Sequence, residues 1–377
     1  MIKISPDRKK IFQQSKSIVI KVGSSLLVED KLGAIKKQWF VSFIEDVIDL
    51  RKLGKTVIIV SSGAINLGRK ILNLKDNELT LEQEQAAASV GQIELSKEYQ
   101  EQFKFNGLIC SQVLITLDDF TNRRRYLNCK STLQTLLKLG VIPIVNENDT
   151  VATDEIRYGD NDRLAAQVAS ICESDLLILL SDIDGLYTES PKKSKNAEHI
   201  PFISEITEEI ELMAEGPEND YSHGGMKTKI EAAKVTTSIG CNLVIADGRK
   251  SNPISNIFEN KATWFLASQS VKAARKKWIL NMKSLGEITI DFKAEKALKS
   301  GKSLLPVGAT KCVGKFSRGD VVAVKREDGQ IIAKGLASFN QLETGKILGI
   351  KSEDIPGVLG YNRKPELIHR DNMAFFN

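Results

Sequence analysis

Six short runs rich in Val, Ile and Leu alternate with longer helix-patterned segments over the first two thirds of the chain, and this alternation constrains the fold most. The runs are almost continuously apolar, as strands are when helices cover both faces of their sheet. We predict strands at 17–22, 56–60, 108–115, 141–145, 176–180 and 243–246, and helices near 36–53, 80–104, 122–139, 161–172 and 227–239. This order predicts an α/β fold, a three-layer αβα sandwich with a mainly parallel sheet.

Four of these runs end in segments of small and polar residues. The segments are KVGSS at 21–25, SSGAI at 61–65, NEND at 146–149 and SDIDG at 181–185. In open α/β sheets, ligands bind at the carboxyl ends of the strands. Glycine, hydroxyl and carboxylate groups gathered there are more typical of a binding site than of a core. We therefore expect the ligand site at this edge of the sheet.

The pattern changes after residue 269. Residues 270–284 contain five Lys or Arg, no acidic residue, no glycine and no proline, and we interpret them as a linker. Beyond it, the apolar runs 321–325 and 330–334 flank Asp328-Gly329, a strong hairpin signal because both residues accept a positive φ. We predict a loosely ordered N-terminal extension at 1–15, an α/β domain at 16–269, the linker, and a small mostly β domain at 285–372.

Charge and cysteine content indicate the compartment and the partners. Residues 271–377 hold 20 Lys/Arg and 11 Asp/Glu, a balance of +9, which leaves 33 and 37, or −4, for the rest. Five scattered cysteines without a CxxC pair argue against a zinc site or a disulfide framework. The basic N-terminus lacks the apolar region of a secretory signal, and no apolar run is long enough for a membrane span. These features predict a cytoplasmic protein without membrane association.

The segment at 223–229, HGGMKTK, is the sharpest candidate for binding phosphate, because the chain contains neither GxxxxGK[ST] nor GxGxxG. Two glycines precede a predicted helix whose first turn carries Lys227 and Lys229. Cations are unfavourable at a helix N-terminus unless an anion is present, and a polyphosphate would satisfy both the lysines and the free N–H groups. A flexible surface loop is the less favoured interpretation. Two other polar segments can also be interpreted as purely structural. Residues 146–149 could form Asx-turns, and Asn161 or Asp162 could simply cap the helix that follows.

Taken in order, these motifs resemble those of the amino-acid kinase superfamily, and the NEND and GDND pair resembles the glutamate 5-kinases within it. The motifs are KVGSS from Lys21, SSGAI from Ser61, VNEND from Val145, GDND from Gly159, SDIDGLY from Ser181 and GGMKTK from Gly224. The C-terminal part, with SLLP from Ser303 and FSRGD from Phe316, is similar to the PUA domain that many bacterial members carry. The resemblance extends from about residue 16 to residue 372.

The resemblance implies transfer of the ATP γ-phosphate to the side-chain carboxylate of L-glutamate, which gives L-glutamyl 5-phosphate and ADP as the first step of proline biosynthesis. It also implies Mg²⁺ as a cofactor with no protein ligand assigned, feedback inhibition by proline, and a homo-oligomer, either dimer or tetramer. Lys21, Lys229 and Asp162 would be catalytic, and Ser62, Asp149 and Asn161 would hold glutamate. The nucleotide would contact Lys21, Ser181, Asp182, His223, Gly224, Gly225, Met226, Lys227, Thr228 and Lys229.

The chemistry of such a transfer fits these residues. A glutamate side chain is already ionised at neutral pH, with a pKa of about 4.3, and needs no general base. It needs in-line positioning and cations around the transferring phosphoryl group, and lysines on two separate loops can supply them. The alternatives are another member of the superfamily (an aspartate, acetylglutamate or uridylate kinase) and, from a different class, an RNA-binding protein acting through its PUA-like domain.

Overall fold

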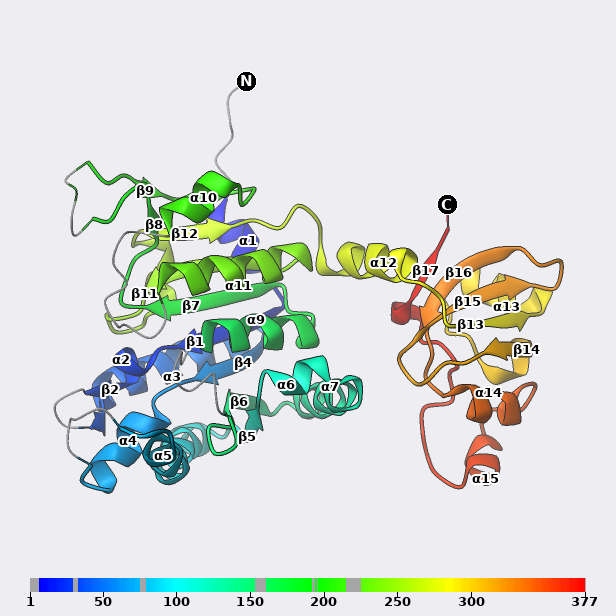
Figure 1. The fold of residues 1–377 in the computed structure, drawn as a ribbon, viewed down its shortest axis with the longest axis horizontal. Coiled ribbons are helices and arrows are strands. Elements are labelled where there is room, and N and C mark those ends of the chain that lie inside the picture. Colours follow the sequence, from blue (N-terminus) through cyan, green and yellow to red (C-terminus); the bar gives the residue numbers. More distant parts are fainter. Residues whose placement is uncertain are drawn as a thin grey trace. The chain divides into compact units, whose positions relative to one another are not determined.

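The computed structural model describes residues 7–29, 33–74, 79–152, 161–191, 194, 196–214 and 225–376. The chain divides into two compact units, residues 1–271 and 272–377 (Figure 1). Among the described helices, none combines the length and the apolar character that a membrane crossing needs.

An eight-stranded sheet forms the centre of the first unit, in the order β10-β12-β11-β7-β1-β4-β6-β5. Neighbouring strands run parallel except for β11 and β12. The strands are β1 (Ser17–Val22), β4 (Thr56–Ser61), β5 (Cys110–Ile115), β6 (Ile142–Glu147), β7 (Leu176–Ser181), β10 (Phe202–Ile203), β11 (Asn242–Asp247) and β12 (Ala262–Phe265). The predicted fold class is confirmed, and each of the six predicted strands is present.

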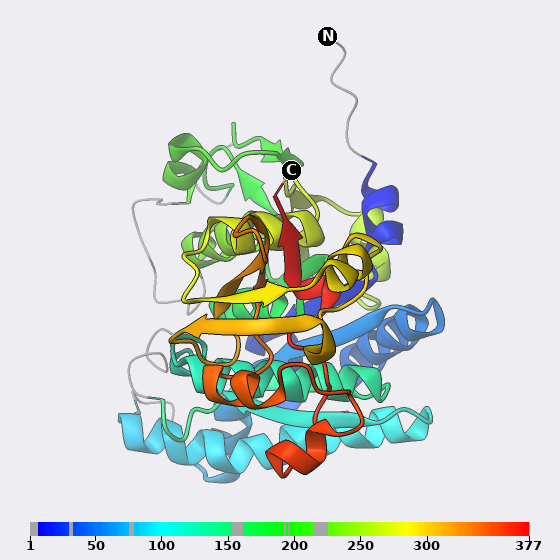
Figure 2. The same cartoon turned by 90° about the vertical axis from the view of Figure 1, so that its right-hand side faces the viewer.

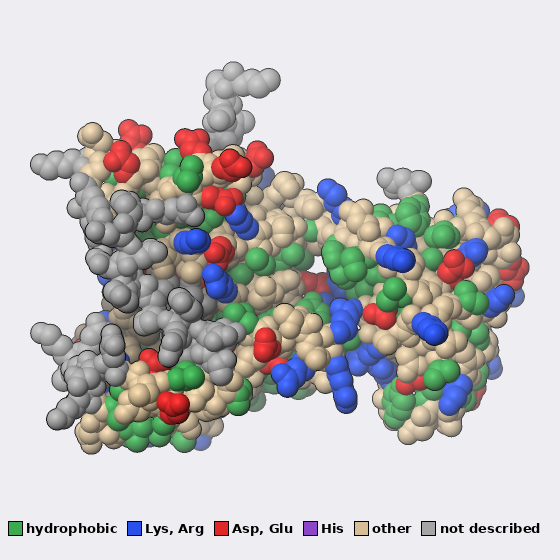
Figure 3. Space-filling model, viewed as in Figure 1, with side chains coloured by type: hydrophobic (Ala, Val, Ile, Leu, Met, Phe, Trp, Pro, Cys, Tyr) green, Lys and Arg blue, Asp and Glu red, His purple; other side chains and the backbone are tan. Residues whose placement is uncertain are grey.

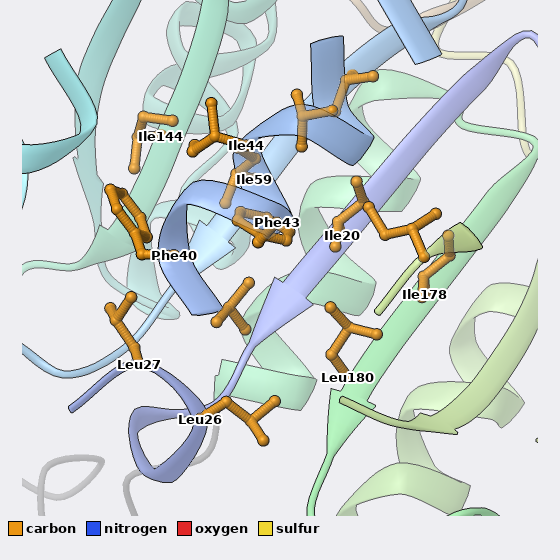
Figure 4. Close-up of a cluster of buried hydrophobic side chains, with 14 of the residues drawn as sticks. Ile20, Leu26, Leu27, Phe40, Phe43, Ile44, Ile59, Ile144, Ile178 and Leu180 are labelled. Carbon is orange, nitrogen blue, oxygen red and sulfur yellow. The ribbon is translucent and has the colours of Figure 1, made fainter. Parts of the chain in front are cut away.

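Helices cover both faces of this sheet. The helices α3 (Lys37–Lys52), α4 (Ala64–Ile71) and α5 (Leu81–Phe105) pack with one hydrophobic cluster, and α7 (Arg123–Lys138), α9 (Asn161–Cys172) and α11 (Met226–Ser238) pack with the other. Figure 4 shows part of the first cluster, in which Phe43 of α3 lies near Ile20 of β1 and Ile59 of β4, and Phe40 lies near Leu27 and Ile144. Because side chains alternate along a strand, Lys21 of β1 lies on the opposite face, the face of α9 and α11.

Smaller elements complete the first unit. They are α1 (Arg8–Gln14), α2 (Ser24–Leu27), β2 (Val28–Glu29), β3 (Ala34–Ile35), α6 (Asp118–Thr121), β8 (Leu186–Tyr187), β9 (His199–Ile200), α10 (Glu208–Met213) and η1 (Ser255–Phe258).

The crossing of α4 and α5 positions one loop of the candidate site. A Cβ atom on Gly68 would lie 1.7 Å from the carbonyl oxygen of Ala87, and one on Gly91 would lie 1.8 Å from that of Ala64. Only glycine allows such a close approach of two backbones. Gly63, just before α4, turns the chain with a φ of +106°. The two helices therefore hold the loop after β4 firmly against the sheet edge.

The N-terminal segment is more ordered than we predicted. The Lys55 ammonium donates to the carbonyl oxygens of Phe12 at 2.8 Å and Ser15 at 2.6 Å, and the Phe12 ring packs edge-on against Phe258. These contacts dock α1 onto the first unit, so the expectation of a loosely ordered extension is wrong for residues 8–14. Lys55, which holds α1 in place, lies about 40 residues away in the sequence, so the local pattern of residues 8–14 could not predict this contact.

The second unit is built on a five-stranded sheet in the order β14-β13-β15-β16-β17, drawn in yellow to red in Figure 2. The expected hairpin is β15 and β16, with Gly329 at a φ of +94° in its turn. The elements of the second unit are α12 (Val271–Asn281), β13 (Gly286–Ile290), α13 (Phe292–Lys299), η2 (Pro306–Gly308), β14 (Ala309–Gly314), β15 (Val321–Arg326), β16 (Ile331–Leu336), α14 (Gln341–Ile347), α15 (Ile355–Leu359), η3 (Arg370–Asn372) and β17 (Met373–Phe375).

The basic segment that we interpreted as a linker forms α12, and from Lys272 onward it belongs to the second unit. The ammonium of Lys334 donates to the carbonyl oxygens of Leu280 at 2.7 Å and Met282 at 2.8 Å. A cation at a helix C-terminus satisfies carbonyl groups that have no partner within the helix. This contact ties the end of α12 to the second sheet.

Candidate active site

One buried carboxylate holds two lysines at the carboxyl edge of the large sheet. The Nζ atom of Lys21 lies 2.6 Å from Asp162 Oδ1, and the Nζ atom of Lys229 lies 3.0 Å from Asp162 Oδ2. Asp162 is fully buried, and Lys21 and Lys229 are 8% and 3% exposed. The three residues come from β1, α9 and α11. The structure thus brings together the three residues that the sequence marked as catalytic candidates.

The charge balance of this cluster favours an anionic ligand. Burial by itself would raise the pKa of Asp162, but the charges and hydrogen bonds of Lys21 and Lys229 outweigh it and hold that pKa below its ordinary value. Asp162 is therefore ionised at neutral pH. One negative and two positive groups leave an excess positive charge in a site with little water, which suits a phosphoryl group.

Local sequence explains how each lysine reaches this point. Lys21 is the one charged residue of the otherwise apolar end of β1. On the other side, α11 begins at Gly225, which has no side chain to cap the first N–H groups. Lys229 occupies the first turn of α11 and points inward, while Lys227 is exposed. The helix start therefore directs N–H groups and a lysine to the same region.

Two of the three residues expected to bind glutamate, Ser62 and Asn161, meet beside this cluster. Asn161, next to Asp162, donates through Nδ2 to Ser62 Oγ at 2.6 Å and to the Ser61 carbonyl oxygen at 3.3 Å. Asp149 is half-buried in the loop after β6. Burial, and then repulsion from Glu84, raise the pKa of Asp149 to about 6. A carboxylate in such a place gains from a cationic partner.

Besides Lys21 of β1, the described residues expected to bind the nucleotide lie at the end of β7 and at the start of α11. Ser181 ends β7, which pairs directly with β1, and its hydroxyl lies 3.1 Å from Asp182 Oδ1. Met226 and Thr228 lie in the first turn of α11, where Thr228 Oγ1 donates to the Gly225 carbonyl oxygen at 2.7 Å. His223 and Gly224 lie outside the described residues, as do Gly159 and Asp160 of the GDND motif.

Sequence reasoning missed a polar network behind the site. Asn146 of β6 receives a hydrogen bond from Asn161 at 3.0 Å and donates one to Gln92 Oε1 at 2.8 Å. Tyr99 donates to Ser61 Oγ at 3.0 Å. Gln92 and Tyr99 lie on the inner face of α5, among Ala88, Gly91 and Leu95. The one sequence signal that could have predicted this network is a polar side chain at a core-facing position of an amphipathic helix.

The described residues fit a metal ion that is carried by the nucleotide. Within the described ranges, no group of three or more His, Cys, Asp or Glu side chains is arranged to hold a metal, and both oxygens of Asp162 already contact lysines. Mg²⁺ is commonly held by substrate phosphates and water with few protein ligands.

Comparison with known proteins identifies relatives of both units. The model of the amino acid kinase family matches residues 16–247, and that of the PUA domain matches residues 286–359. The chain is 50% identical to glutamate 5-kinase of Paracoccus denitrificans (strain Pd 1222) over 96% of this chain and 97% of the relative. It is also 50% identical to glutamate 5-kinase of Roseobacter denitrificans (strain ATCC 33942 / OCh 114), over 95% and 96%. Among solved structures, carbamate kinase from Giardia lamblia bound to AMP-PNP matches 68% of this chain and 100% of its own, with 17% identity and a TM-score of 0.48.

Proposed function

Because the chain belongs to the glutamate 5-kinases of the amino acid kinase family, we propose that Lys21, Asp162 and Lys229 form its phosphoryl-transfer site. The activity is phosphorylation of the glutamate side-chain carboxylate by ATP, the first step of proline biosynthesis. The observation that supports the site most is the single buried carboxylate that holds two ammonium groups at 2.6 and 3.0 Å.

In this mechanism the acceptor is already a nucleophile. The glutamate carboxylate is ionised at neutral pH, so no residue has to remove a proton. Lys21 and Lys229 stabilise the negative charge of the transferring phosphoryl group and of the oxygens that attack and leave. Asp162 keeps the two ammonium groups in place and reduces their repulsion, and it takes no part in proton transfer. When bound with the nucleotide, Mg²⁺ neutralises part of the phosphate charge.

Glutamate would lie against Ser62, Asn161 and Asp149, with Asp149 facing the α-ammonium. The nucleotide would lie along the end of β7, at Ser181 and Asp182, and along the segment 223–229 at the start of α11. In this proposal the acceptor and the donor would lie on either side of the lysine pair, as an in-line transfer requires.

The pH dependence of glutamate use tests the role of Asp149. Because the pKa of Asp149 is raised to about 6, this carboxylate gains a proton as the pH falls through 6. We expect kcat/KM for glutamate to fall below about pH 6, while kcat at saturating glutamate changes less. Asp149→Asn should raise the glutamate KM and remove this pH dependence. Steady-state kinetics between pH 5 and 8 would measure both, and a wild-type profile that Asp149→Asn leaves unchanged would contradict the assignment.

The raised pKa of Asp149 also predicts that Asp149→Asn stabilises the folded protein at neutral pH. A carboxylate whose pKa is higher in the folded than in the unfolded state stabilises the fold most below its ordinary pKa, and this contribution is lost as the pH rises through about 6. Without glutamate, Asp149→Asn should therefore unfold at a higher temperature than wild type at pH 7.5. Thermal unfolding at pH 7.5 and 5 would show the difference diminishing at the lower pH.

The activity itself is tested with an acyl-phosphate trap. With ATP, Mg²⁺ and hydroxylamine, glutamate should yield the glutamyl hydroxamate, while aspartate, N-acetylglutamate and UMP should give little ADP release. If one of the other acceptors is used better, the chain belongs to another branch of the family in function.

Regulation, assembly and location are further proposals from family membership. We expect proline to inhibit at the glutamate-dependent step, the protein to form a homo-oligomer (dimer or tetramer) and the enzyme to work in the cytoplasm. Inhibition kinetics, light scattering and cell fractionation would test the three in turn.

RNA binding by the second unit is the alternative that its +9 charge suggests. On the face of this unit shown in Figure 3, Lys and Arg side chains are interspersed with acidic and apolar ones, whereas acidic side chains gather over α10 of the first unit. Such mixing is more typical of a solvated surface than of a phosphate-binding patch. A gel shift of the full-length protein over a salt series would decide between the two.

A further inference from the structure

Three buried amides form a hydrogen-bonded row that leads from the proposed glutamate site into α5. Asn161 donates to Asn146 at 3.0 Å, Asn146 donates to Gln92 at 2.8 Å, and Gln92 donates to Ser96 Oγ at 3.2 Å. Asn161, Asn146 and Gln92 are 7%, 3% and 8% exposed. The amides therefore have little access to water as a hydrogen-bond partner, and each one constrains the orientation of the next.

A backbone carbonyl sets the direction of this row. Asn161 Nδ2 lies 3.3 Å from the Ser61 carbonyl oxygen, a group that can only accept. The amide nitrogen of Asn161 must face that carbonyl, so Asn146 must present its oxygen to Asn161 and its nitrogen to Gln92. Gln92 must in turn present its oxygen. If one amide were reversed, two donors or two acceptors would face each other in a buried place.

The direction of the row decides what Asn161 and Ser62 can offer to a ligand. Asn161 Nδ2 has two hydrogens and already faces three acceptors, Ser62 Oγ at 2.6 Å among them, while no described residue donates to its Oδ1. Its free capacity is therefore that of an acceptor, which suits an α-ammonium. Ser62 accepts from Asn161, so its own hydroxyl hydrogen remains available for a carboxylate. The pair is complementary to the two charges of an amino acid.

We propose that Gln92, which lies one amide behind the site, is a positioning residue for glutamate. Its Oε1 fixes the orientation of Asn146, and through Asn146 that of Asn161, so that Asn161 presents oxygen to the substrate ammonium. The inference rests on the proposed role of Asn161 and Ser62 in binding glutamate. It adds a residue that does not touch the substrate and that no site motif contains.

Two substitutions separate orientation from packing. Gln92→Met keeps the length of the side chain but removes the acceptor, and we expect the glutamate KM to rise about tenfold while kcat and the ATP KM stay within about twofold. Gln92→Glu keeps an oxygen facing Asn146, and its glutamate KM should stay within about threefold of wild type. Gln100→Met, the same change at an exposed position of α5, serves as the matched control and should behave as wild type.

Replacing the acceptor at position 92 with a donor gives a sharper test than removing it. Gln92→Lys places a donor where Asn146 needs an acceptor, and should raise the glutamate KM more than Gln92→Met does. Adding Asn146→Asp supplies acceptors on both sides and should restore much of the lost affinity, which loss of packing would not do. Thermal unfolding of each full-length variant checks the fold. If the methionine variant fails to fold, the comparison of Gln92→Lys with the Gln92→Lys, Asn146→Asp double variant still decides.

Different results would contradict the positioning role of Gln92 and the proposed function. If wild type forms glutamyl hydroxamate but Gln92→Met keeps the wild-type glutamate KM, or Gln92→Met and Gln92→Glu raise it equally, the positioning role is wrong. If the glutamate KM, the ATP KM and kcat all shift together with the unfolding temperature, Gln92 is structural only. If wild type forms no glutamyl hydroxamate, the proposed function itself fails.

Discussion

Lys229→Ala should lower kcat by about 100-fold or more while the protein stays folded. The substitution removes one of two ammonium groups that Asp162 holds at the sheet edge, and with it a preorganised charge for the transferring phosphoryl group. Because this charge matters most in the transition state, the loss should appear in kcat more than in the glutamate KM. Lys21→Ala should behave similarly, since its Nζ atom contacts the other oxygen of the same carboxylate.

A lysine on the same helix provides the control for this prediction. The side chain of Lys234 on α11 is 44% exposed and forms an ion pair with Glu211 on the surface. Lys234→Ala should keep nearly the wild-type kcat, and the comparison removes general effects of losing a lysine from α11. Steady-state rates of ADP release with saturating glutamate and ATP measure both variants. A purified Lys229→Ala enzyme that works at the wild-type rate would rule out the proposed site.

Asp162→Asn should affect both activity and stability. The amide keeps the size of the side chain but leaves two buried ammonium groups without a compensating charge. Breaking a buried ionic group in this way typically costs about 3–5 kcal/mol of unfolding free energy. We expect kcat to fall about 1,000-fold or more, because both lysines lose their fixed positions. Denaturant unfolding and steady-state kinetics would measure the two losses.

Two conditions should change the stability loss in Asp162→Asn in known directions. The pKa of Asp162 is lowered in the folded state, so this carboxylate stabilises the fold above its ordinary pKa, and the contribution is lost as the pH falls through the folded value. The difference between wild type and variant should therefore shrink below about pH 4. Added MgATP should also reduce it, since phosphate can replace the missing negative charge.

A surface carboxylate serves as the control for stability. Asp49 pairs with Lys52 at 2.8 Å on α3, and both side chains are largely exposed. Asp49→Asn should cost less than about 1 kcal/mol, as solvent-exposed ion pairs do. An Asp162→Asn variant that unfolds like Asp49→Asn would show that the buried cluster does not hold the two lysines as its geometry implies.

Much of the site could be predicted because its residues lie in motifs that end predicted strands. Lys21, Ser62, Asp149 and Ser181 each lie at or just after the end of an apolar run. The rule that parallel strands present ligands at their carboxyl ends predicted that they lie at one edge. The resemblance to a known family then suggested a role for each. Their roles in catalysis and binding stay predictions, whereas the contacts among Lys21, Asp162 and Lys229 are features of the structure.

Other features were beyond local reasoning because they depend on partners far away in the chain. Gln92 and Tyr99 lie inside a long helix, and their importance follows from the side chains of β6 and β4 that they meet. The docking of α1 depends on Lys55, and the end of α12 depends on Lys334. Each of these residues has an ordinary local sequence, so no pattern marks it.

The amino-acid sequence alone determined the alternation of strands and helices, the parallel sheet and the set of candidate residues, because apolar periodicity and turn chemistry act over a few residues. Only the tertiary structure decided that Lys21 and Lys229 share one carboxylate, and that a row of amides orients Asn161. Both depend on how closely elements distant in sequence pack, for example where Gly68 and Gly91 let α4 and α5 meet, and such packing is a property of the whole fold.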